Sequence, residues 1–385
     1  VTFDGETVPY PQTKQKEPVE VIVATLGEIL HKHVIDQIIN CLQNLRKTQK
    51  FEKIQKDYSW QSYDVARKIQ TTTEVTKILD NHKGEDQNKC LVNLLKKIDE
   101  IILKIQSSIS AGTANKRTRL KLYNNLNTEF WLKISICQMQ RFQANNQVDS
   151  CQTLLEWLRF FKFSYVKAKN EIVINHGYQT HAYGCESLKL MDPIIWQPYF
   201  PNIFLQMSST SATNRFVFLT GTPGDGKTTC MKFYSHLLGK YHYKVQFLEN
   251  SFSALLIEDL FKVLTQGPFV IQVNLTSCSD KLLHTLSNKA MLIKSTSNQR
   301  KAFYQFVITT NLNQPEIPHL TGVYRKAFRQ ISIPQQLDDL SIDVKLLIEC
   351  FTNFELMRAQ MRILIRMFDD IYMGNGNKIS QSQAI

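Results

Sequence analysis

The sequence has little glycine and one long stretch without proline. Only 14 glycines occur among 385 residues, and no proline stands between Pro18 and Pro193. Because both residues interrupt helices, their scarcity favours helices over the first half of the chain.

Other absences exclude whole classes of protein. The eight cysteines form no C-x-x-C pair, which argues against a structural zinc site, and they are too sparse for a disulfide scaffold. A reducing compartment fits this usage. No apolar run approaches the ~18 residues of a membrane-spanning helix, so we expect no transmembrane segment, and we expect no signal peptide. Since the first residue is Val1, we expect a processed product or a fragment.

Positive charge is in excess. Lysine and arginine number 46 against 34 aspartates and glutamates, which gives a formal net charge of +12. A surplus of this size suits a polyanionic partner, either nucleic acid or an anionic membrane face, although a merely soluble basic protein would also show it. Hydrophobic residues make up 43% of the chain, enough for real cores, and the length predicts two or three domains.

The first half predicts helices. Apolar residues recur at three- and four-residue spacing, which places a stripe on one helix face: Leu30, Val34, Ile38, Leu42 and Leu45, and then Leu91, Leu94, Ile98, Ile101 and Ile105. Residues 152–169 are a further helical candidate. We expect an irregular arm over 1–19, and over 20–204 an all-α region for oligomerisation or nucleic-acid binding. The polar segment 208–214 predicts a loop.

From Arg215 the pattern changes to short apolar runs separated by helical stretches. The expected strands are 216–220, 244–248, 269–275 and 306–310, and the expected helices include 227–238 and 255–264. Alternation of this kind predicts an α/β fold with a mostly parallel sheet over residues 205–335. Residues 336–385 predict C-terminal helices and a frayed tail.

One motif carries specific chemistry. Residues 221–228 read Gly221-Thr222-Pro223-Gly224-Asp225-Gly226-Lys227-Thr228, which fits G-x-x-x-x-G-K-S/T, and Thr229 follows. The glycines let backbone amides turn toward an anion, and the following helix N-terminus favours phosphate. Lys227 would reach the β- and γ-phosphates, and the Thr228 hydroxyl would hold Mg²⁺. The motif therefore predicts an ATP site that uses Mg²⁺.

Polar and basic residues follow downstream. The strand 306–310 ends in Asn311, which beside the phosphate loop would lie near the γ-phosphate and orient water. Before it, residues 287–301 predict a hairpin that carries Lys289 and Lys294. After it comes the basic-apolar segment 323–331, with Arg325 and Arg329.

This order of motifs resembles the superfamily 3 helicases of small viruses, with the parvovirus large nonstructural proteins the best match. Picornavirus-type helicases and circular-DNA replication initiators stay open. The resemblance covers about residues 205–335. It implies an AAA+-like P-loop ATPase that forms a ring, expected to be a hexamer, and translocates on single-stranded nucleic acid, DNA favoured over RNA. It implies viral genome replication in the host nucleus, or alternatively at cytoplasmic replication sites.

The resemblance also implies roles for single residues. Lys227 and Asn311 would be catalytic, and Arg325, or else Arg329, would complete a neighbouring subunit's site. Lys289 and Lys294 would grip nucleic acid in the channel of the ring.

The acidic strand departs from that pattern. Gln272 and Asn274 stand in strand 269–275 where the family has paired acids, and an amide cannot act as a general base. Glu258, Asp259 and Asp280 are alternative acids, although 255–264 has helical spacing. Two other functions therefore stay open: a nucleotide-binding assembly or nucleic-acid-binding protein that does not hydrolyse ATP, and a membrane-associated replication ATPase using the amphipathic stretch 20–44.

Several further candidate binding residues have a simpler structural interpretation. His31 with His33, and His176 with His181, lack the spacing of a nickase metal site, and such pairs are more often surface residues than ligands. The segment 116–123 holds four positive charges and an aromatic ring. It would contact a phosphate backbone or simply form a solvated helix start.

Overall fold

The computed structural model describes residues 18–47, 57–82, 84–111, 115–145, 157–190, 199–212, 216–221, 226–247, 269–275, 305–311 and 328–333, together with 8, 53, 54, 285 and 288. The chain divides into two compact units. The first holds the described residues up to 176 and those from 180 to 190. The second holds 177–179 and the described residues from 199 onward.

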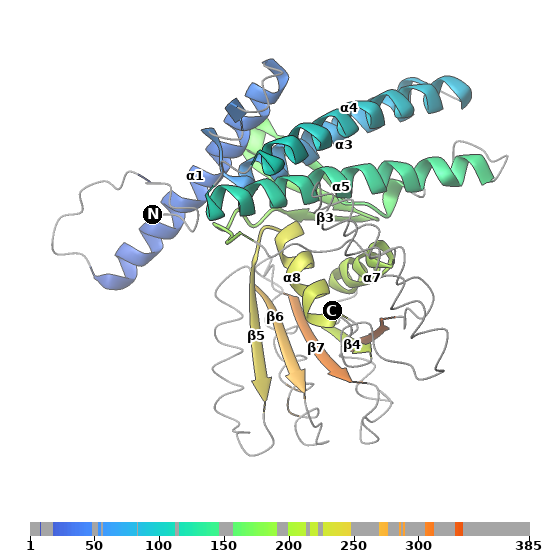
Figure 1. Ribbon diagram of the computed structural model, residues 1–385. Helices are drawn as coiled ribbons and strands as arrows, with labels where there is room; N and C mark the ends of the chain where they lie inside the picture. The colour runs from blue at the N-terminus through green and yellow to red at the C-terminus, as the bar shows by residue number, and fades with distance from the viewer. Residues whose placement is uncertain are drawn as a thin grey trace. The chain divides into compact units, whose positions relative to one another are not determined.

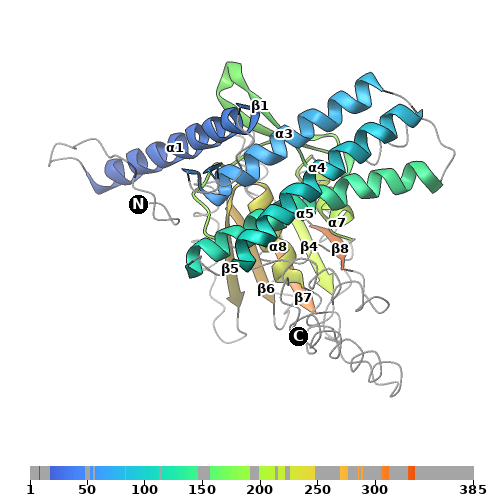
Figure 2. The same cartoon turned by 45° about the horizontal axis from the view of Figure 1, so that its top comes forward.

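Four long helices dominate the first unit. They are α1 (Val19–Lys47), α3 (Trp60–Asn81), α4 (Gly84–Ser110) and α5 (Lys116–Asn145). Figure 2 shows α3, α4 and α5 lying side by side, and α1 packs against α3. Both predicted apolar stripes are largely buried, with Ile38, Leu91, Ile98 and Ile105 fully covered. The helical character of this region is therefore confirmed.

Helix α3 is the central element of this unit. Its first turn is capped by Ser59, whose hydroxyl accepts a hydrogen bond from the Ser62 amide at 3.1 Å. Helices α1, α4 and α5 and a short strand contact it. Because neighbours cover so much of this helix, even its charged residues Arg67 and Lys68 are buried, and each forms an ion pair.

The expectation of an all-α N-terminal region is wrong at its C-terminal end. Strands β1 (Lys162–Val166), β2 (Glu171–His176) and β3 (Gln179–Ala182) form a sheet in the order β1-β2-β3, with a 3-10 turn at Lys167–Lys169. Strands β1 and β2 pair antiparallel. The helix expected over 152–169 therefore does not extend through 162–166.

The reason lies in a period-two pattern. Along β2, Ile172, Ile174 and His176 are buried while the residues between them are more exposed, as in a half-buried strand. Asn170 takes the left-handed conformation, with φ at 51°, and so ends the short turn between β1 and β2.

The second unit is built on a five-stranded sheet. Its strands are β4 (Phe216–Gly221), β5 (Tyr241–Phe247), β6 (Phe269–Leu275), β7 (Gln305–Asn311) and β8 (Phe328–Ser332). The spatial order is β5-β6-β7-β4-β8, and every neighbouring pair runs parallel. Figure 1 shows β5, β6 and β7 pointing the same way. The predicted strands are thus present, although β5 begins three residues earlier than expected.

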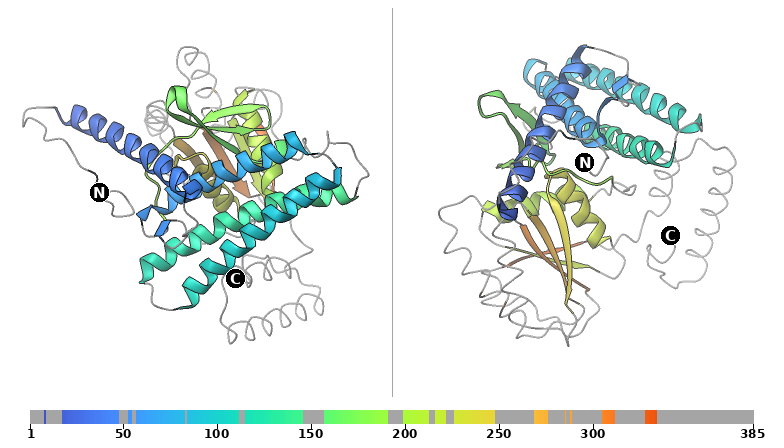
Figure 3. Two further views of the ribbon diagram at one scale, coloured as in Figure 1. Left: turned by 90° about the horizontal axis from the view of Figure 1, so that it is seen from above. Right: turned by 90° about the vertical axis from the view of Figure 1, so that its left-hand side faces the viewer.

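Two helices pack on one face of this sheet. Helix α8 (Lys227–Leu237) contacts β4, β5 and β6, and α7 (Phe200–Ala212) contacts β4 and β8. Rings of α7 and α8 meet directly, with Phe204 and Tyr234 centroids 5.3 Å apart. Figure 3 shows both helices beside the sheet from two further directions. Strand β4 is buried along its whole length, so its carboxyl end is rigidly placed.

The loop expected over 208–214 is wrong as far as Ala212, because α7 continues to that residue. Hydroxyl groups in this stretch bond back to the helix: the Ser209 Oγ donates to the Gln206 carbonyl at 2.7 Å. Met207, Ser208 and Thr210 are buried, which holds the polar stretch in the helix.

Among the described residues, none of the helices has the length and apolarity that crossing a bilayer requires.

Candidate nucleotide-binding site

The predicted phosphate loop joins β4 to α8. Gly221 is the last residue of β4, and Gly226 caps the N-terminus of α8 with φ at 76°. A Cβ at Gly226 would meet nothing within 4 Å, so glycine is needed there for its backbone conformation rather than for space. Residues 222–225, which complete the motif, lie outside the described part.

The two functional side chains of the loop lie at the first turn of α8. The Lys227 Nζ donates to the carbonyl oxygen of Gly221 at 2.9 Å, so the lysine folds across the loop toward the end of β4. Thr228 follows, half-buried, and Thr229 is exposed. The N-cap Gly226 has no side chain to bond the first helical amides, which leaves this helix end suited to an anion.

The residue that reaches Thr228 from the sheet is Gln272. This glutamine of β6 is fully buried, and its Nε2 donates to the Thr228 Oγ1 at 3.1 Å and to the Thr309 Oγ1 of β7 at 3.1 Å. In P-loop enzymes an aspartate holds Mg²⁺ together with the loop's hydroxyl residue. Of the two amides in this strand, the structure places Gln272 against the loop's hydroxyl residue, and the Asn274 side chain lies outside the described part.

His242 completes this cluster, and no sequence pattern predicted it. Its Nε2 lies 3.0 Å from the Gln272 Oε1, from the neighbouring strand β5. Burial lowers the pKa of His242 below its ordinary value, Lys232 and Lys244 lower it further, and the bond to Gln272 opposes both effects. The imidazole is thus neutral near pH 7. Only the pairing of β5 with β6 brings this histidine to the site.

The described residues of this cluster do not supply the ligands of a conventional Mg²⁺ site. Mg²⁺ in phosphate sites is usually held by one or two carboxylates, and Gln272 presents N–H groups to Thr228 instead. Over the described residues, no group of three or more His, Cys, Asp and Glu side chains could hold a metal ion. The alternative acids Glu258, Asp259 and Asp280 lie outside those residues.

The expected sensor lies at the same edge of the sheet. Asn311 ends β7 and pairs in register with Gly221 of β4, so the two backbones are adjacent where the phosphate loop begins. The side chain of Asn311 is outside the described part, and its role stays a prediction. Arg325, Lys289 and Lys294 lie outside it as well.

Arg329, the second candidate for an arginine that reaches a neighbouring subunit, has a partner in its own chain. It lies on the edge strand β8, and its Nη1 donates to the Ser209 Oγ of α7 at 2.8 Å. This contact favours a role in holding α7 to the sheet.

The other candidates from the sequence lie in the first unit. His31 and His33 belong to α1, and residues 116–123 begin α5. The expectation that His176 is a surface residue is wrong: it is fully buried, stacks on Phe161 at 3.9 Å and bonds to the Arg159 carbonyl at 2.9 Å. Its role is structural.

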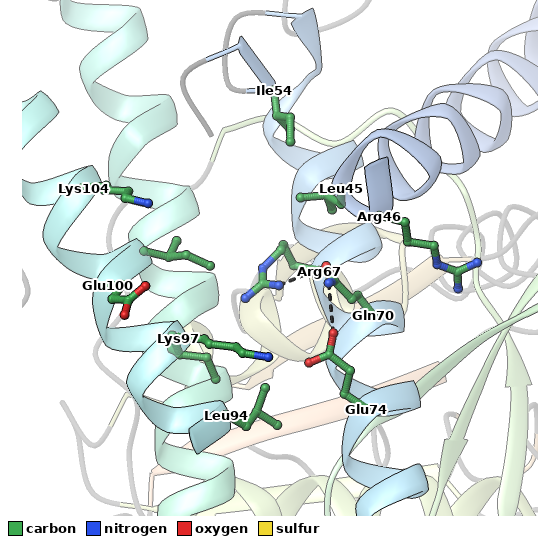
Figure 4. A pocket seen from close by; sticks show the side chains of 12 residues that line it. Leu45, Arg46, Ile54, Arg67, Gln70, Glu74, Leu94, Lys97, Glu100 and Lys104 are labelled. Carbon is green, nitrogen blue, oxygen red and sulfur yellow. Dashed lines mark hydrogen bonds between the residues drawn. The ribbon is translucent and has the colours of Figure 1, made fainter. Parts of the chain in front are cut away.

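A hollow of about 640 Å³ lies among α1, α3 and α4 of the first unit. Figure 4 shows its lining, with apolar side chains such as Leu45 and Leu94 and charges of both signs, among them Lys97, Lys104 and Glu100. Arg67 and Glu74 are linked through Gln70 by hydrogen bonds of 3.1 and 3.0 Å. Because both signs of charge are present, the lining does not define a ligand class.

Comparison with known proteins gives limited similarity. No family model matches the chain. Dynein axonemal heavy chain 2 from Homo sapiens is 25% identical over 240 residues, which is 62% of this chain. The Mus musculus protein of the same name is 25% identical over 241 residues, again 62% of this chain. The chain spans about 5% of the length of these curated relatives.

Proposed function

We propose that the second unit is an ATP-binding P-loop domain of the AAA+-like type. The observation that carries this is the meeting of Lys227 and Thr228, at the start of α8, with polar side chains from β6 and β7. Strand β7, which ends in Asn311, pairs with β4 beside the phosphate loop, where a sensor residue would lie near the γ-phosphate. The similarity to axonemal dynein heavy chains is consistent with ATP binding.

In this proposal each part of the site has a defined task. The first amides of α8 and the helix dipole bind the phosphates, and Lys227 exchanges its bond to the Gly221 carbonyl for the β- and γ-phosphate oxygens. Asn311 would lie near the γ-phosphate because its backbone pairs with Gly221.

The test is ATP binding by titration calorimetry with Lys227→Ala. We expect a loss of affinity of at least about tenfold, because a charge-assisted bond to phosphate is removed. Lys232→Ala is the matched control, since Lys232 is exposed on the same helix and its loss changes the net charge equally. Equal affinity of the two variants would contradict the proposal.

The narrower proposal is a superfamily 3 helicase of viral replication, acting as a ring on single-stranded DNA. It is supported by the order of the motifs, from the phosphate loop through Lys294 and Asn311 to Arg325. ATP hydrolysis stimulated by single-stranded DNA and abolished by Lys227→Ala would support it. A protein that stays monomeric with ATP would count against it.

The second candidate is a nucleotide-binding protein that does not hydrolyse ATP and acts in assembly or nucleic-acid binding. The specific observation in its favour is the amide of Gln272 against Thr228.

A further inference from the structure

The side-chain amide of Gln272 lies against the hydroxyl group of Thr228, at the start of the helix that follows the phosphate loop. Gln272 lies on β6, which packs against α8, and its side chain contacts both Thr228 of α8 and Thr309 of the neighbouring strand β7. The side chain is fully buried, so water does not compete for its amide.

The surrounding hydrogen bonds fix the orientation of this amide. The Thr309 hydroxyl donates to the Val273 carbonyl at 3.4 Å, so its oxygen is available to accept from the Gln272 Nε2. On the other side, the His242 Nε2 donates to the Gln272 Oε1 at 3.0 Å. The amide oxygen therefore points at His242 and the amide N–H groups point at the two threonine hydroxyls.

This orientation is the opposite of what a cation needs at Thr228. A carboxylate there would add negative charge and accept the hydroxyl proton, leaving the threonine oxygen free for Mg²⁺. Gln272 instead donates to that oxygen and directs the positive end of its dipole toward the place of the ion. The neutral amide also cannot accept a proton from attacking water.

We propose that Gln272 makes this a site that holds a nucleoside triphosphate with no Mg²⁺ bound at Thr228 and without turnover. This inference rests on the proposed ATP-binding function in its non-hydrolysing form, and it excludes the turnover that the helicase proposal requires. The triphosphate is retained by Lys227 and the N-terminus of α8, and Gln272 holds Thr228, Thr309 and His242 in one buried network.

The experiment measures ATP affinity by calorimetry in excess Mg²⁺ and in excess EDTA. For the natural protein we expect the same affinity in both. Gln272→Glu keeps the length of the side chain, and Thr228, Thr309 and His242 can all donate to the new carboxylate. We expect this variant to bind ATP at least about tenfold more tightly with Mg²⁺ than with EDTA. Gln330→Glu, an exposed change on β8, is the matched control and should behave as the natural protein does.

The natural protein decides the question even where Gln272→Glu fails to fold. Tighter binding with Mg²⁺ by tenfold or more, or phosphate release that Lys227→Ala abolishes, would overturn the inference and leave the proposed function intact. A folded Gln272→Glu protein that stays indifferent to Mg²⁺ would also overturn it. Absence of ATP binding in both conditions would instead refute the proposed function.

Discussion

Replacing His176 tests whether a buried neutral histidine limits the stability of the first unit in acid. The ring is fully covered, stacks on Phe161 and donates through Nε2 to the Arg159 carbonyl. Burial lowers its pKa from 6.5 to about 3, the bond to Arg159 works against this, and His181 and Lys162 lower it further. The folded protein therefore keeps this imidazole neutral through mild acid.

The magnitude follows from linkage. Below pH 6.5 the unfolded chain binds a proton on this histidine that the folded chain does not bind until about pH 3. The free energy of unfolding therefore falls with falling pH, by about 2 kcal/mol between pH 7 and pH 5 from this group alone. His176→Gln removes the titration and should flatten the pH dependence by that amount.

Urea unfolding followed by tryptophan fluorescence measures this effect. Three of the four tryptophans, at 60, 131 and 157, are buried among the described residues of the first unit, so their emission reports on that unit. His82→Gln is the matched control, because His82 is exposed at the end of α3. Parallel curves of stability against pH for the natural protein and His176→Gln would refute the reasoning, whatever the absolute stability of the variant.

Two further substitutions test the backbone and the buried charges. Gly226→Ala should lower the free energy of unfolding by about 1–2 kcal/mol, because φ is 76° at this residue. Gly27→Ala within α1 should instead raise the free energy of unfolding by about 0.5–1 kcal/mol. Denaturant titration compares the two variants, and a change of the same sign in both would contradict the argument. Glu129→Ala leaves the buried guanidinium of Arg67 without its carboxylate and should cost about 3–5 kcal/mol, while Lys133→Ala, which removes a partly exposed ion pair, should cost under about 1 kcal/mol. A similar cost for both would show that the Arg67 pair is effectively solvated.

The sequence predicted those elements whose pattern is long and local. The stripes of α1 and α4 repeat over several turns, and the strands around the phosphate loop are short apolar runs with clear ends. Strand β1 was missed because Leu154, Leu155, Leu158 and Phe161 recur at helical spacing, and the predicted helix was continued through 162–166. The pairing of β1 with β2, which buries Phe163 opposite Ile174, decides between helix and strand.

The buried charges of α3 were not predictable either. Arg67 and Glu129 are 62 residues apart, and nothing local distinguishes them from the many solvated charges of the helical region. Their pairing depends on the contact between α3 and α5, which brings the Tyr63 hydroxyl to the same carboxylate at 2.6 Å. A helical pattern shows which face is apolar, but it does not show where a polar residue on that face will meet a partner.

The nucleotide site likewise contains residues that the sequence predicted and residues that only the folded structure brings together. The loop residues Gly221 to Thr228 act through a contiguous segment, so their spacing alone predicts a phosphate site. The acid's place is different, because it depends on how β6 packs against α8. The glutamine bonds to Thr228 and Thr309 together, and the pairing of β5 with β6 presents His242 to the other end of its amide. A polar residue in an apolar strand marks β6 as unusual, but only the packed sheet shows that Gln272 lies against Thr228. The chemistry of this site therefore depends on Thr228, Thr309 and His242, each of which is 30 or more residues from Gln272 along the chain.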